Sequence, residues 1–171
     1  MNQMITVVLR LIHIVSGVSW AGAVFLMVGF IYPSMRDAGP QGGALMQQFQ
    51  RRRLPVFMNG AAGLTMLSGF ILYGRAVATT DGAWARTTPG MVFGLGGLAT
   101  ILAAIIGGVF VSRSAVHLAK IGETVQGAGG RPSPEQAAEL GRLQARMGSA
   151  MRAVAGLLII AVVAMATARY L

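Results

Sequence analysis

The chain has 171 residues, of which 54% are apolar and only 11% are charged, whereas soluble domains carry about 25% charged residues. Lys and Arg outnumber Asp and Glu by 14 to 5, but the basic residues flank apolar runs and form no separate basic domain, which argues against a nucleic-acid partner. The absence of cysteine excludes disulfides, thiolate metal sites and cysteine nucleophiles. We therefore predict an all-α integral membrane protein with a single domain, residues 1–171.

Four apolar runs predict membrane spans, because a helix needs about 20 apolar residues to cross a bilayer. The first run passes Ala21-Gly22-Ala23, which resembles a signal-peptide cleavage site, and continues well beyond it, so we expect it to be retained as a span. The predicted fold is a four-helix bundle with spans at residues 5–31, 54–73, 90–111 and 153–168.

The third and fourth helices extend beyond their spans. Ser133-Pro134-Glu135-Gln136 has the N-cap serine, first-turn proline and third-position glutamine of a helix start, so the fourth helix is predicted to run about 50 Å from there. The third continues past Arg113 to a stop at Gly127. Together they predict a cytoplasmic helical hairpin, residues 113–150, in which Leu118, Ile121 and Val125 can face Leu140, Leu143 and Met147.

Basic residues are distributed unevenly between the two sides of the predicted bundle. By the positive-inside rule, the side with more Lys and Arg is cytoplasmic, so both termini are predicted to be periplasmic. Ten basic residues lie on the predicted cytoplasmic side and four on the other, the latter being Arg10, Arg75, Arg86 and Arg169.

Small residues recur every four positions in the second and third spans, as expected for helices that pack closely in lipid. The two stripes are Ala61, Thr65, Gly69 and Gly96, Thr100, Ala104, Gly108. Asn59, the only amide in a span, is expected to face the bundle.

The first span carries an ionisable residue, His13, on one helical stripe with Gly17, Trp20 and Val24. Such a residue usually faces the protein interior or a cavity, and it is a functional hypothesis by default. Counting about 1.5 Å per residue places His13 level with Met66, and Met165 lies nearer the outer mouth.

Imidazole and thioether are soft donors, which suit copper or a haem b iron. His13, Met66 and Met165 are therefore candidate metal ligands, and Trp20 is a candidate pocket wall. Two alternatives stay open: methionine commonly fills irregular helical cores, and a lone histidine can bond to Ser16 or a neighbouring carbonyl with no cofactor present.

The remaining ionisable residues limit the functions that are possible. Arg10 lies close enough to the outer end to extend to the headgroups. His117 is predicted on the opposite side from His13, so the two cannot ligate one haem. No span carries Asp or Glu, which argues against a proton-driven carrier. The Arg51-Arg52-Arg53 cluster either binds anionic lipid or an acidic partner, or only keeps this loop on the cytoplasmic side of the membrane.

The stretch LRLIHIVSGVSWAGAVFL, residues 9–26, resembles the first span of small four-helix bacterial membrane families. These are the CopD-like copper-resistance membrane domains, the membrane protoporphyrinogen oxidases and related uncharacterised proteins. The CopD-like resemblance implies periplasmic copper handling. The oxidase resemblance implies haem near the first-span histidine and a basic residue early in the third helix, where TTPGMVFGLGGLAT has none.

Three functional hypotheses result. The first is a nonenzymatic membrane protein that holds copper or haem in the outer half of the bundle through His13. The second is an accessory subunit without a cofactor, which packs against a larger respiratory or photosynthetic membrane complex or forms a homo-oligomer. The third is a haem-dependent, porphyrin-oxidising enzyme.

Overall fold

The computed structural model describes residues 3–127 and 129–171, and every regular element within them is a helix. The first and third long helices are each continued through a short π-helix, and four helices of the described ranges are long and apolar enough to cross a membrane. The elements are α1 (Gln3–Leu26), η1 (Met27–Ile31), α2 (Tyr32–Asp37), α3 (Pro40–Arg51), α4 (Leu54–Ala78), η2 (Trp84–Arg86), α5 (Thr88–Ile106), η3 (Gly107–Val111), α6 (Ser112–Gly127), α7 (Pro134–Thr167) and η4 (Ala168–Tyr170).

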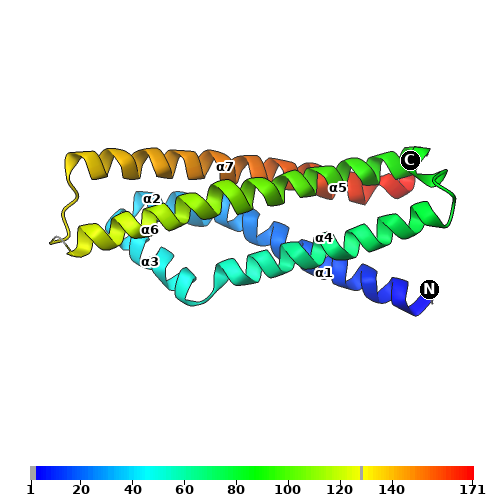
Figure 1. Cartoon of the computed structure of the whole chain (residues 1–171), viewed down its shortest axis with the longest axis horizontal. Helices are drawn as coiled ribbons and strands as arrows, with labels where there is room; N and C mark the ends of the chain where they lie inside the picture. The colour runs from blue at the N-terminus through cyan, green and yellow to red at the C-terminus, as the bar shows by residue number, and fades with distance from the viewer. Residues whose placement is uncertain (1–2, 128) are drawn as a thin grey trace.

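The long helices lie roughly along one axis, and the two ends of the molecule differ (Figure 1). Both chain termini and the α4–α5 connection lie at one end, which we call the terminal end. The α6–α7 connection lies at the other, which we call the hairpin end. At about 1.5 Å per residue, the 34 residues of α7 extend about 50 Å, some 20 Å more than the hydrocarbon core of a bilayer.

The bundle consists of two tightly packed helix pairs. Contacts are most extensive between α1 and α4 and between α5 and α7, and far fewer join one pair to the other. The pairs meet at a core cluster in which Trp20 and Ala61 of the first pair pack with Ala103 and Leu158 of the second. Toward the terminal end they diverge, so that the start of α1 lies well away from the end of α7 (Figure 1).

Small residues allow the close approach within each pair. Ala61 and Thr65 are buried on α4, and a Cβ added to Gly96 of α5 would lie 3.2 Å from the Cβ of Ala164. The contact face of α5 differs from the predicted stripe, because Ala103 has no exposed surface whereas Gly108 is exposed. A four-residue period advances about 40° per step around an α-helix, so a strict stripe rotates off a straight contact.

The expectation that Asn59 faces the bundle is wrong. Its side chain is exposed, whereas the buried residues of α4 are Ala61, Thr65 and Ser68. Two residues correspond to about 200° of rotation, so Asn59 lies on the side of α4 opposite Ala61.

The predicted helix ends at the hairpin end are confirmed. Ser133 Oγ accepts a hydrogen bond from the Gln136 backbone N–H at 3.2 Å, and the Gln136 side chain accepts one from the Ser133 N–H at 2.9 Å. The α6 helix ends at Gly127, as predicted, and Gly129 and Gly130 have φ angles of +94° and +81°, which glycine adopts without strain. The α6 helix packs against α7, and the six apolar residues expected between them are buried or half-buried.

The segment between the first two spans contains two helices that the residue pattern does not predict. The α2 helix continues the line of α1, and α3 returns toward α4 (Figure 1). Their junction is tight, because a Cβ on Gly42 would overlap the backbone of Met35. Few apolar residues and two adjacent glycines, Gly42 and Gly43, weaken the helical signal there.

Candidate binding cavity

His13 is held by a hydrogen bond to the neighbouring helix. Its Nδ1 lies 2.8 Å from the backbone oxygen of Thr65 on α4. Because a carbonyl oxygen can only accept, Nδ1 carries the proton, and Nε2 of the neutral ring keeps its lone pair. A bond to a neighbouring carbonyl is what the cofactor-free alternative expects of this histidine. It is also the arrangement common among metal-ligating imidazoles, whose other nitrogen donates to a carbonyl.

Polar groups next to His13 continue this α1–α4 contact. Thr65 Oγ1 lies 2.9 Å from Ser16 Oγ, and the Ser16 hydroxyl donates to the backbone oxygen of Ile12 at 2.6 Å. Ser68 Oγ lies 3.3 Å from His13 Nδ1 and donates to the Leu64 oxygen at 2.5 Å. The imidazole is therefore oriented by α4.

Gly69 makes room for the imidazole ring. A Cβ at this position would lie 2.9 Å from His13 Cε1 and 3.2 Å from Nδ1, closer than atoms normally approach. The third member of the predicted small-residue stripe on α4 thus allows the ring to lie against the helix.

His13 lines a cavity of about 1070 Å³ between the two helix pairs at the terminal end. Cofactor and ligand pockets commonly measure about 300–1,000 Å³, so this volume suits a large organic molecule better than a single ion. The walls come from α1, α4, α5, α7 and the α4–α5 connection, and most of them are apolar.

Aromatic side chains line one side of the cavity. The ring centroid of Trp84, in η2, lies 5.3 Å from that of Tyr73 and 5.9 Å from that of Phe93. The Tyr73 hydroxyl donates to the backbone oxygen of Gly90 at 3.3 Å. Gly90 fits closely against η2, because a Cβ there would lie 2.1 Å from the Trp84 backbone oxygen. These contacts join the end of α4 to the start of α5.

The cavity is strongly basic. Arg10, Arg75 and Arg169 line it together with His13, and no Asp or Glu is among its described lining residues. Arg75 is half-buried, and the Arg169 guanidinium carbon lies 5.2 Å from the ring centroid of Tyr170. Arg10 and Arg169 are exposed at the border of the cavity. Three positive charges beside a largely apolar space favour an amphipathic anion and disfavour a bare cation.

The structure brings three of the predicted site residues to this cavity and places the fourth elsewhere. His13, Met66 and Met165 all line it, from α1, α4 and α7. Trp20, on the same stripe of α1, lies instead in the core cluster with 6% of its surface exposed. The stripe thus runs from the cavity into the core as the two helix pairs converge.

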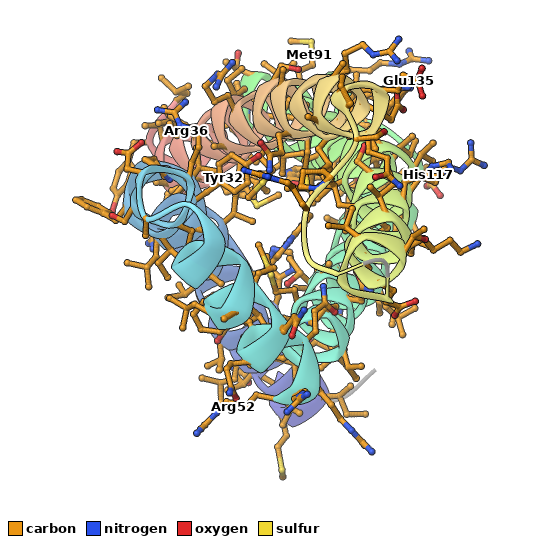
Figure 2. The ribbon with its side chains drawn as sticks, turned by 90° about the vertical axis from the view of Figure 1, so that its left-hand side faces the viewer. Tyr32, Arg36, Arg52, Met91, His117 and Glu135 are labelled. Atoms are coloured by element: carbon orange, nitrogen blue, oxygen red, sulfur yellow. The ribbon has the colours of Figure 1, made fainter. Side chains whose placement is uncertain are left out.

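Other predicted residues lie away from the cavity. Arg51, Arg52 and Arg53 are exposed at the α3–α4 junction, and Figure 2, which views the hairpin end, shows Arg52 at the edge of the molecule far from α7. Their contact with lipid or an acidic partner stays a prediction. His117 is on α6 and borders a separate, smaller cavity, so the two histidines lie in different sites.

The arginines of the cavity were not predicted as site residues. Arg10, Arg75 and Arg169 were assigned only to one side of the membrane, and Arg10 was expected to extend to the headgroups. The available signal is that three separate spans each have one arginine inside or just beyond the same predicted end. Charge recurring at one depth on facing helices is a feature of shared polar cavities.

Within residues 3–127 and 129–171, no group of three or more His, Cys, Asp or Glu side chains is arranged to hold a metal ion. A single imidazole with nearby thioethers remains sufficient for a haem iron, which takes four of its ligands from the porphyrin. Comparison with family models, with curated proteins and with solved structures finds no match for this chain. The site is therefore interpreted from its own residues.

Proposed function

We propose that this protein is a multi-pass membrane protein that binds one haem in the terminal-end cavity, with His13 Nε2 as the iron ligand. The observation that carries the proposal is the orientation of His13: its Nδ1 is bonded to the Thr65 carbonyl, and the ring lines a large, basic cavity. Met66 and Met165 are the thioethers available as a second ligand. When bound, haem supplies an iron that exchanges one electron or binds a small molecule.

Charge and volume favour haem over copper. A copper ion needs several donors close together in a small space, whereas this cavity measures about 1070 Å³. The arginines repel a bare cation, whereas a guanidinium forms charge-assisted, paired hydrogen bonds with a carboxylate. The two propionates of haem match a site in which Arg10 and Arg169 border an apolar interior.

The aromatic side chains suit a flat ring. Tyr73, Trp84 and Phe93 present large apolar surfaces to the cavity, which is the kind of wall that encloses a porphyrin. His13 Nε2 then fixes the position of the iron, and the arginines fix the orientation of the carboxylates. The residues available from this chain thus account for both the apolar and the charged parts of the ligand.

We place the terminal end on the periplasmic side of a bacterial inner membrane. The hairpin end and the α3–α4 junction hold ten of the 14 basic residues, and cytoplasmic regions are enriched in Lys and Arg. In this orientation the cavity lies in the outer half of the bilayer.

The test is a visible spectrum of the full chain, expressed with excess haem precursor and purified in a mild detergent. We expect a Soret band and about one haem per chain, with no stoichiometric copper in the metal analysis. His13→Ala is expected to abolish the band, whereas His117→Ala, the matched control at the hairpin end, is expected to retain it.

A rescue experiment separates loss of the ligand from loss of the fold. Added imidazole is expected to restore haem binding to His13→Ala, because the small base can occupy the space that the side chain leaves. A wild-type protein that stays colourless when titrated with haem would refute the proposal, as would a His13→Ala variant that binds haem as tightly as the wild type.

A further inference from the structure

A second, smaller cavity lies at the hairpin end. Its volume is about 200 Å³, and it is separate from the cavity that holds His13. One wall comes from η3 and α6 and the other from α7. The lining residues are Val109, Phe110, Arg113, Ser114, His117, Leu143 and Arg146.

Helical spacing brings these residues together. Phe110, Arg113 and His117 follow one another at intervals of three and four, so they share a face of η3–α6. Leu143 and Arg146 are three residues apart on α7, which packs against α6. In Figure 2, which looks onto this end, α6 carries the labelled His117 and lies beside α7.

Every polar side chain that lines this cavity can donate a hydrogen bond, and two of them are arginines. Arg113, His117 and Arg146 have exposed side chains at its border, and Ser114 is buried with 4% of its surface exposed. No carboxylate is among the described lining residues. The closest acid along α7, Glu139, forms an ion pair with Arg142 instead.

One of the cations is fixed in place. The Arg146 guanidinium carbon lies 5.4 Å from the ring centroid of Phe110, in a cation–π contact that joins α7 to η3. Arg113 lines the same cavity, so an anion bound there would lie near two guanidinium groups. Guanidinium groups form paired, charge-assisted hydrogen bonds with phosphate oxygens, so a phosphate group is an anion that suits this pair.

We infer that the small cavity is a binding site for a phosphate group. Its volume is below the usual range of about 300–1,000 Å³ for pockets that enclose whole drug-sized ligands, so it suits a headgroup or an inorganic ion. Val109, Phe110 and Leu143 add an apolar side next to the cations. Arg113 follows directly on the predicted third span, at the level where phospholipid phosphates lie.

The test measures the dissociation constants of three probes for the full chain in neutral detergent, using native mass spectrometry and calorimetry. The probes are a short-chain phosphatidylglycerol, the diacylglycerol with the same chains, and inorganic phosphate. We expect the phosphatidylglycerol to bind, and the Arg113→Gln/Arg146→Gln double variant to bind it roughly tenfold more weakly or worse. Arg142→Gln, one turn away on α7, is the matched control and is expected to stay within about twofold of the wild type.

The probes distinguish the source of the phosphate. If only the phospholipid binds, the site takes a lipid headgroup. If inorganic phosphate binds, with or without the lipid, the site takes the free ion. Either result supports the inference if the double variant loses that binding. The inference is overturned if neither phosphate probe binds, if the diacylglycerol binds as tightly as the phospholipid, or if the double variant binds like the wild type.

Two further variants keep the result interpretable. Arg113→Lys/Arg146→Lys preserves the charges and is expected to retain part of the affinity. Partial retention would show that the loss in the glutamine variant comes from the missing charge. Circular dichroism checks that both variants are folded. His13→Ala is expected to bind phosphate probes normally, because its cavity is at the other end of the molecule. Failure of the haem proposal therefore leaves this inference unaffected.

Discussion

Replacing Gly69 with alanine tests whether the imidazole of His13 depends on close helix contact. The added Cβ would lie 2.9 Å from His13 Cε1, whereas carbon atoms pack best at about 3.5–4.0 Å. The ring must therefore move by about 0.6 Å or more, the difference between 3.5 and 2.9 Å. A shift of that size along the bond lengthens the 2.8 Å contact between His13 Nδ1 and the Thr65 oxygen to about 3.4 Å, beyond normal hydrogen-bond length.

The free-energy cost follows from these displacements. Overpacking a well-packed contact costs about 1–3 kcal/mol, and losing the hydrogen bond adds about 1 kcal/mol. Alanine's preference for helix over glycine, which applies here as it does at Gly63, offsets about 1 kcal/mol of this cost. We therefore expect Gly69→Ala to lower the free energy of unfolding by about 1–3 kcal/mol and to weaken haem binding, because the imidazole is no longer held in position.

Unfolding by sodium dodecyl sulfate in mixed micelles, followed by circular dichroism, measures the difference. Gly63→Ala is the matched control, since nothing lies within 4 Å of a Cβ added there on the same helix. It is expected to be as stable as the wild type or slightly more stable, because alanine favours helix. If Gly69→Ala were as stable as Gly63→Ala and took up haem equally well, the contact between His13 and α4 would not control the site.

Two further predictions concern topology and helix ends. Alkaline phosphatase fused after Leu171 is expected to be active, and green fluorescent protein fused at the same place is expected not to fluoresce. Insertion of the same reporters at Gly130 is expected to give the opposite pair of signals. A fluorescent fusion at the carboxyl terminus would reverse the proposed orientation. Ser133→Ala removes the hydrogen bond to the Gln136 N–H and is expected to lower the free energy of unfolding, measured in the same micelles, by about 0.5–2 kcal/mol. Ser149→Ala is the control, because the described hydrogen bond of its hydroxyl is to Arg146 O in the same helix. Equal stability of the two variants would show that the α7 cap contributes nothing.

The sequence predicts helices and helix ends better than it predicts the distances between helices. The Ser133 cap and the Gly127 stop depend on neighbouring residues, so local pattern sufficed for both. His13 and Trp20 share one stripe of α1, but one lines a cavity and the other lies in the core. Periodicity predicts which face of a helix points inward. It does not predict how far the neighbouring helices lie from that face at each level of the bundle.

The arginines of the cavity show the same limit. Near the end of a span, an arginine can extend to the headgroups or turn into the bundle, and the amino-acid pattern is identical in both cases. Arg75 turns into the bundle, because the divergence of the two helix pairs opens the space that its side chain lines. This divergence depends on contacts among all four helices, which no local window contains.

The pairing of α1 with α4 also has a consequence for biosynthesis. The described hydrogen bonds of the His13 ring are all to α4, so the imidazole can be oriented as soon as residue 78 has left the ribosome. The wall that α7 contributes, including Met165 and the nearby Arg169, is synthesised about 90 residues later, which corresponds to roughly 5–20 s at typical elongation rates. During that interval the face of the first helix pair that we propose binds haem is open on one side, so a large planar molecule can reach it without any later movement of the finished bundle.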